Sequence, residues 1–148
     1  MPRFENSKIL PYSDQQLYSI IINVEQYSEF LPWCKDSVIS NRIDENNFDA
    51  KLVIGYKALD ENYTSRVKGI YLKEITSNAI AGPFKYLDSL WTFKKSGKKC
   101  KVKFRLDYEF KSFLLGKIMG TLFQKASEKM FEAFEERAKS LYSNWLFQ

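Results

Sequence analysis

Alternation of apolar and charged residues at the start of the last third of the chain limits its fold more than any other feature. The alternating residues are Val102, Lys103, Phe104, Arg105, Leu106, Asp107, Tyr108, Glu109 and Phe110. A period of two is typical of an antiparallel strand with one face buried and the other in water. The segment Phe48–Tyr56 repeats the pattern. The chain therefore contains a sheet with one apolar face that another layer must cover.

Weaker strand patterns surround these two segments. They cover Ser37–Ile43, Tyr63–Leu72, Glu74–Ala81 and Tyr86–Lys95, and a short polar strand comes first at about Arg3–Leu10. The run Lys95–Lys99 has the composition of a hairpin tip, with Gly97 in the strained position. Connections between consecutive antiparallel strands are short, so we expect a meander.

Helical periodicity lies before and after the strands. Ser13 and Gln16 have the spacing of a capping box, and Tyr12 and Leu17 that of a hydrophobic staple. The apolar stripe that follows is Leu17, Ile20, Ile21 and Val24. A second helical turn at Glu25–Leu31 is predicted to stop at Pro32, because proline disfavours a helical residue before it.

The long C-terminal segment, from about Phe113 to Ser143, is also helical in period. Its predicted apolar stripe is Met119, Leu122, Phe123, Ala126, Met130, Ala133, Phe134, Ala138 and Leu141. A helix of ~30 residues is ~45 Å long, enough to cross the whole sheet. We therefore expect one α+β domain over residues 1–148, a curved antiparallel sheet wrapped around this helix. Periodicity alone leaves open whether the space between sheet and helix is filled or hollow.

Missing residue types restrict the chemistry. The chain has no histidine, which removes Ser-His-Asp and Cys-His nucleophilic sites and His-ligated zinc. Cys34 and Cys100 match no metal spacing, so we expect two buried thiols, no metal and no cofactor. Neither a targeting segment nor a run of 18 apolar residues is visible, which predicts a cytoplasmic protein that meets a membrane only peripherally, at its inner face.

Three motifs together resemble a known family. They are Tyr27–Cys34 (YSEFLPWC), Gly82–Leu87 (GPFKYL) with Ser89, Trp91 and Phe93, and Leu106–Phe110 (LDYEF) followed by a helix ending in Ala133–Ala138 (AFEERA). In this order they are similar to the coenzyme Q-binding proteins of the START-like superfamily. Bacterial members are also labelled ribosome association toxins or polyketide cyclase-like proteins. One departure is Ser89, where the family often has glycine. This difference bears on the local backbone geometry at residue 89 and not on the resemblance as a whole.

The resemblance implies a helix-grip (START-like, Bet v1-like) fold with an apolar tunnel, and binding of ubiquinone in support of respiration. Position by position, it places in the tunnel and its entrance Phe30, Leu31, Pro32, Trp33, Trp91, Phe93, Leu106 and Tyr108. We add Met119 and Phe123 from the long helix as lining residues. Tyr56 and Tyr108 are the predicted donors to a quinone oxygen, and the indoles of Trp33 and Trp91 offer a flat surface plus an N–H. For each aromatic residue, a place in a solid core is the alternative.

Two surface regions are candidate contacts with a membrane or an anionic partner. Phe113, Leu114 and Leu115 are unusually apolar for a helix start, and either touch a bilayer as a flap or dock on the sheet. Lys94, Lys95, Lys98 and Lys99 cluster at the hairpin, where lysines also block edge pairing and aid solubility. Anionic lipid is the favoured partner of the cluster and ribosomal RNA the second.

The leading hypothesis is a non-enzymatic carrier of ubiquinone or a similar hydrophobic ligand, with no DNA partner. The runner-up is a factor that binds the ribosome and blocks association of its subunits. An enzyme acting on a polyketide or aromatic substrate would need a carboxylate or tyrosine in the cavity. Asp107 and Glu109 fall on the wet face of their strand, which disfavours that third hypothesis.

Overall fold

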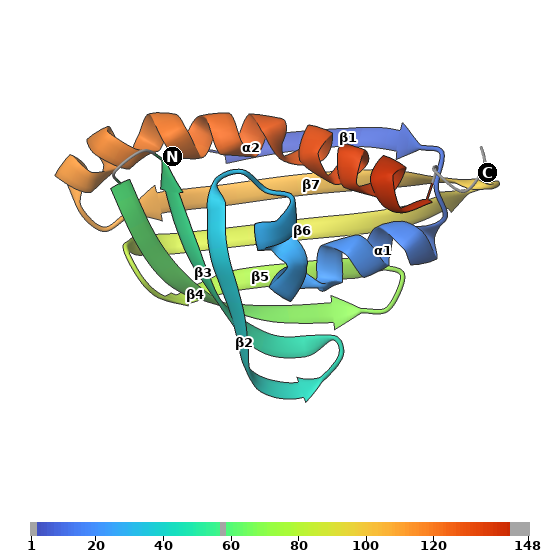
Figure 1. Ribbon diagram of the computed structural model, residues 1–148, viewed down its shortest axis with the longest axis horizontal. Helices are drawn as coiled ribbons and strands as arrows, with labels where there is room; N and C mark the ends of the chain where they lie inside the picture. The colour runs from blue at the N-terminus through green and yellow to red at the C-terminus, as the bar shows by residue number, and fades with distance from the viewer. Residues whose placement is uncertain (1–2, 57–58, 143–148) are drawn as a thin grey trace.

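A seven-stranded antiparallel sheet curves around one long helix (Figure 1). The computed structural model describes residues 3–56 and 59–142, without the side chains of Tyr56 and Leu59. In chain order the elements are β1 (Arg3–Leu10), α1 (Asp14–Ile22), the 3-10 helix η1 (Val24–Glu29), β2 (Cys34–Asp44), β3 (Asn47–Tyr56), β4 (Leu59–Ile70), β5 (Glu74–Ala81), β6 (Phe84–Ser96), β7 (Lys99–Phe110) and α2 (Phe113–Tyr142).

The sheet is a meander with one addition. Strands β2 to β7 pair in sequence order, and β1 pairs with β7 at the far edge. Register shifts in β2 and at the start of β6 mark bulges, which bend strands and help a sheet to curve. Gly97 has φ +63° at the β6–β7 tip, a backbone conformation that side chains disfavour, as the sequence predicted. Ser89 pairs regularly with Ser77 and Leu106, so its departure from glycine leaves the strand undisturbed.

Both helices begin and end close to where the sequence places them. The Ser13 hydroxyl accepts a hydrogen bond from the backbone N–H of Gln16, whose side chain accepts one from the backbone N–H of Ser13, which completes the capping box. The four predicted stripe residues of the first helix, Leu17, Ile20, Ile21 and Val24, are all buried. The turn before Pro32 is the 3-10 helix η1.

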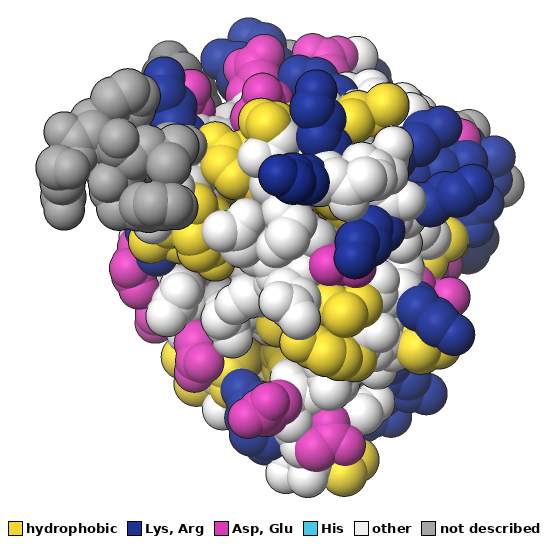
Figure 2. Space-filling view, turned by 90° about the vertical axis from the view of Figure 1, so that its right-hand side faces the viewer, with side chains coloured by type: hydrophobic (Ala, Val, Ile, Leu, Met, Phe, Trp, Pro, Cys, Tyr) yellow, Lys and Arg dark blue, Asp and Glu magenta, His cyan; other side chains and the backbone are white. Residues whose placement is uncertain are grey.

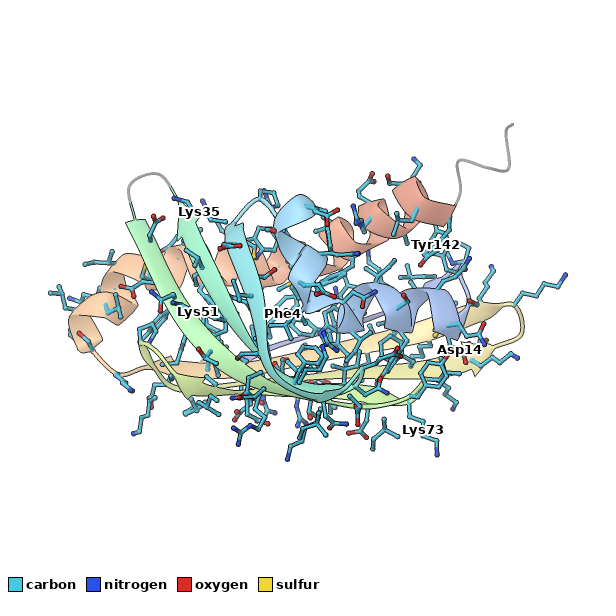
Figure 3. All side chains as sticks on the ribbon, turned by 60° about the horizontal axis from the view of Figure 1, so that its bottom comes forward. Phe4, Asp14, Lys35, Lys51, Lys73 and Tyr142 are labelled. Atoms are coloured by element: carbon cyan, nitrogen blue, oxygen red, sulfur yellow. The ribbon has the colours of Figure 1, made fainter. Side chains whose placement is uncertain are left out.

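The buried stripe of α2 differs from the prediction in detail. Ala133 is only half-buried and Leu141 is 45% exposed, whereas Phe131, which the predicted stripe omits, is 2% exposed. Phe131 contacts the rings of Trp91 and Phe104. The buried stripe differs because the second half of α2 packs against α1 as well as against the sheet, including its edge strand β1. The resulting interior, with side chains between the helices and the concave face, is seen in Figure 3.

Candidate ligand-binding site

A cavity of about 110 Å³ lies between the concave face of the sheet and the middle of α2. We call it the interior cavity. Its lining is mostly apolar and comes from η1, from every strand between β3 and β7, and from α2. Predicted residues that line it are Trp33, Trp91, Leu106 and Phe123. The interior is therefore neither solid nor a wide tunnel.

Serines form part of the cavity floor. Ser65, Ser77 and Ser89 occupy inward positions on the neighbouring strands β4, β5 and β6. The hydroxyls of Ser77 and Ser89 hydrogen-bond to each other. A serine in place of a branched apolar residue leaves volume unfilled and adds a donor and an acceptor. This patch was missed from the sequence, although small polar residues at inward positions of three successive strands were visible there.

Two tyrosines stand near one end of the cavity. The Tyr27 hydroxyl donates to the carbonyl oxygen of Ile21. The Tyr63 hydroxyl has no hydrogen bond to protein within residues 3–56 and 59–142. Burial raises the pKa of both phenols above the ordinary value, and it raises the pKa of the neighbouring Cys34 thiol to about 11. Tyr63 thus offers a neutral, unused donor to a guest, a role that the sequence analysis gave to Tyr56 and Tyr108.

Several predicted lining residues lie elsewhere. Phe93 does not line the cavity, because it follows Trp91 on the same face toward α1 and packs against Tyr18 with ring centroids 5.5 Å apart. Leu31 and Met119 are buried outside the cavity wall. The side chain of Tyr56 lies outside the described residues. The other three predicted residues, Phe30, Pro32 and Tyr108, line two external grooves.

The larger groove, of about 1140 Å³, runs between the first half of α2 and the edge formed by β1 and β7. We call it the β1–β7 groove. Its residues include Phe4, Tyr108, Phe110, Phe113 and Gly120. Ser127 contributes to both this groove and the interior cavity. Between the two spaces, the rings of Tyr108 and Phe123 are in edge contact, with centroids 4.6 Å apart.

The smaller groove, of about 460 Å³, lies on the opposite side of α2, against η1. We call it the η1 groove. Phe30, Pro32 and Trp33 line it from one side and Ala133 and Arg137 from the other. Trp33 is shared with the interior cavity. Three of the first-motif residues that the resemblance placed at the tunnel and its entrance therefore lie along this groove.

The two predicted contact regions lie at opposite ends of the molecule. Phe113 and Leu114 are 81% and 67% exposed at the start of α2, where β7 ends. Lys94, Lys95, Lys98 and Lys99 are exposed at the other end of β7, a strand of 12 residues and so ~40 Å long. Figure 2 looks onto the lysine end, where dark blue side chains gather along one side. Leu115 is half-buried.

The lining of the interior cavity contains no Asp or Glu side chain among the residues that the structure describes. Asp107 pairs with Arg3, and Glu109 pairs with Lys85, both away from the cavity lining. Among the described residues no cluster of Cys, Asp and Glu side chains could hold a metal ion. In the same part of the chain, no helix combines the length and hydropathy needed to cross a bilayer.

Known proteins resemble this chain along most of its length. A family model described as polyketide cyclase/dehydrase and lipid transport matches residues 10–135. A ribosome association toxin of Rickettsia prowazekii is 41% identical, over 95% of this chain and 99% of the relative. A mitochondrial coenzyme Q-binding protein of Dictyostelium discoideum is 36% identical, over 95% of this chain and 70% of the relative.

The fold has solved counterparts. A START superfamily protein of Mycobacterium smegmatis superposes with a TM-score of 0.79 at 18% identity, over 94% of this chain and 98% of the other. That likeness confirms the predicted START-like, helix-grip architecture. The relatives above carry names of binding or association proteins, while the family description also includes cyclases.

Proposed function

This chain belongs to the polyketide cyclase/dehydrase and lipid transport family, and its relatives include ribosome association toxins and coenzyme Q-binding proteins. On that basis we propose that it binds and delivers a ubiquinone or a similar prenylated molecule without catalysing a reaction. Such delivery would support respiratory electron transport. The observation that carries the proposal is the apolar interior cavity with the Tyr63 hydroxyl beside it, which has no hydrogen-bond partner among the residues that the structure describes.

The cavity is too small to hold the ring of such a ligand unless its lining moves. An apolar cavity of about 150 Å³ in another protein binds benzene, whereas the interior cavity has about 110 Å³. A quinone ring, which has more atoms than benzene, therefore enters only when the lining moves outward. Tyr63 and the Ser65 hydroxyl supply donors for its carbonyl oxygens, while Trp91 and Leu106 supply flat and branched apolar surface.

Energetics also favour a carrier over a tight receptor. Burial of a prenyl chain from water is worth ~0.8 kcal/mol per CH₂ group. A bilayer and an apolar protein interior give nearly the same value, so transfer between them costs little. Delivery then depends on excluding water and on a few hydrogen bonds to the head, which matches the lining of the interior cavity.

The first test is extraction of the purified protein with organic solvent and mass spectrometry for a prenylquinone. A chain that carries none from quinone-rich membranes, and that fails to bind one when it is offered, would contradict the proposal.

A matched pair of variants tests the head-group contact. Tyr63→Phe removes a hydroxyl that has no hydrogen bond to protein within the described residues, so the melting temperature should not change. Quinone binding should weaken about tenfold, because one hydrogen bond to the ligand is lost. Tyr27→Phe removes a hydroxyl bonded to Ile21 and should lower stability while leaving affinity nearly unchanged.

Ribosome association is a second candidate, favoured by one observation. Lys94 and Lys101 stand directly opposite each other on β6 and β7, with Lys95, Lys98 and Lys99 nearby. None of the five takes part in an ion pair within the described residues. Like charges in opposed positions destabilise a sheet, so an anionic partner such as RNA would relieve the repulsion.

Sedimentation with large ribosomal subunits tests this candidate. Lys94→Gln with Lys101→Gln should abolish a salt-sensitive association, and Lys51→Gln with Lys68→Gln, an equal charge change on exposed positions of β3 and β4, should not. Equal loss in both double variants would show a general charge effect instead of a docking surface.

A further inference from the structure

The volume of the interior cavity creates a problem of access. About 110 Å³ is small even for the ring and holds no long prenyl chain. If the protein carries such a ligand, as proposed above, part of the ligand must pass through or remain in a space that adjoins the cavity. Both grooves described above adjoin it, the β1–β7 groove through Ser127 and the η1 groove through Trp33.

Side-chain contacts hold the η1 side closed. Tyr27, Phe30 and Phe134 form a mutual ring cluster with centroid distances of 5.3 to 5.9 Å. Arg137 lies over the Phe30 ring at 5.0 Å and pairs with Glu29 at 3.2 Å. These contacts join η1 to the second half of α2 beside Trp33, so displacement of Trp33 would disturb many of them together.

On the β1–β7 side, Phe123 packs on the rings of Phe84, Tyr108 and Phe110, with centroids 5.2, 4.6 and 6.1 Å away. The turns of α2 that precede Phe123 are held more weakly. Phe113, Leu114 and Ile118 bury little surface at the start of α2. Gly116 and Gly120 lower the helix propensity of the same turns. The Ser127 hydroxyl donates to the carbonyl oxygen of Phe123 at 2.8 Å, a bond to the preceding turn that often bends helices. The bond ends on Phe123, the residue whose ring contacts Tyr108.

We propose that the ligand enters and leaves the interior cavity through the β1–β7 groove, by outward movement of the first half of α2 that separates Phe123 from Tyr108. Aromatic side chains of Phe4, Tyr108 and Phe110 line the route. The route ends at the exposed Phe113, beside Lys111 and Lys117. Apolar and basic side chains together suit contact with the anionic surface of a bilayer.

One substitution blocks each groove from the same helix. A Cβ at Gly120 meets nothing within 4 Å, so Gly120→Phe places a ring in the β1–β7 groove without a backbone clash. Ala133→Phe places the same ring in the η1 groove. Neither variant adds a tryptophan, so quenching of the native indoles by a short-tailed ubiquinone reports binding in both.

The experiment measures transfer of that quinone from vesicles of phosphatidylcholine and phosphatidylglycerol, by stopped-flow fluorescence, together with equilibrium affinity. Gly120→Phe should slow uptake and release about tenfold with unchanged affinity, and Ala133→Phe should leave both rates near those of the parent. Slowing by Ala133→Phe alone, or by neither variant, would overturn the route while leaving the proposed function intact. Failure of the parent protein to bind quinone would overturn both.

Discussion

The two halves of α2 differ in how they meet the rest of the protein. Three of its six buried residues lie in each half, Met119, Ala126 and Ser127 before the midpoint and Phe131, Phe134 and Ala138 after it, but Met119 is the only buried residue before Ala126. The second half packs on α1, η1 and the rings of the sheet, whereas the first half exposes Phe113 and Leu114 beside an open groove. Continuous hydrogen bonding makes one helix of both. Its tertiary support is nevertheless weakest in the first turns, where Phe113, Leu114 and Ile118 are exposed.

This difference shows how a small domain combines stability with access. A helix anchored along its whole length would keep the cavity closed, and one loose along its whole length would not hold the fold. Local opening is easiest where little apolar surface is buried. Ring packing around Phe134 and Phe131 supplies the anchor, and the turns near Gly116 and Gly120 supply the part that can move.

The largest expected effect is the difference in stability between two phenylalanine-to-alanine variants, one in each half of α2. Phe131→Ala removes a fully buried ring in contact with Trp91 and Phe104 and should cost about 3–5 kcal/mol of unfolding free energy. Phe113→Ala, at an 81% exposed position, should change it by less than about 0.5 kcal/mol. Urea unfolding measures both. Similar losses for the two variants would refute the contrast between the halves.

The next largest effect is a difference in how alkaline pH lowers stability through a tyrosine packed on each half of α2. Tyr27 packs on Phe134 and Tyr108 on Phe123, and burial raises the pKa of both phenols, more for Tyr27. A raised pKa favours the neutral folded form. The stability it contributes is complete below about pH 10, the ordinary phenol value, and is lost as pH rises through the folded pKa.

Tyr27→Phe should therefore cost about 1 kcal/mol at pH 7, where it loses the bond to Ile21, and should flatten the fall in stability above about pH 10. Tyr108→Phe loses no hydrogen bond within the described residues and should be nearly neutral at pH 7, with a smaller alkaline effect. Thermal unfolding from pH 7 to pH 11 measures these curves. A steeper alkaline loss in Tyr27→Phe than in the parent would contradict the assignment.

A stabilising substitution gives the smallest effect. Gly120→Ala should raise the unfolding free energy by roughly 0.5–1 kcal/mol, because alanine favours a helix and the added methyl group meets open space. Hydrogen exchange of the amides near residue 120 should slow in parallel. The same variant should slow quinone exchange slightly if the first half of α2 must move, and unaltered exchange kinetics would argue that movement occurs elsewhere.

Much of the fold was predictable because local signals agreed with one another. The alternation at Val102–Phe110, the capping box at Ser13 and the turn at Gly97 each depend on a few neighbouring residues. Rotation of the buried face of α2 was not predictable from its own period. Phe131 is buried because α1 and β1 cover that side, which is a property of chain topology.

The candidate site was predictable only in part for a similar reason. A period of two puts Trp91 and Phe93 on one face, but it does not show where α1 covers that face, so Phe93 was wrongly placed in the cavity. Inward serines at positions 65, 77 and 89 were a readable signal of unfilled space. The proposed donor role of Tyr63 depends on the lack of a hydrogen-bond partner within residues 3–56 and 59–142, which only three-dimensional contacts reveal.

Pairing of β1 with β7 has a consequence for how the chain reaches its native state. Arg3 lies opposite Asp107, and the whole of β1 lacks another strand neighbour in the described sheet. During synthesis, β1 leaves the ribosome long before its partner exists. Contacts between residues that are far apart in the sequence are typical of domains that fold slowly. We expect the meander to form first, with capture of β1 as the late event that completes the sheet.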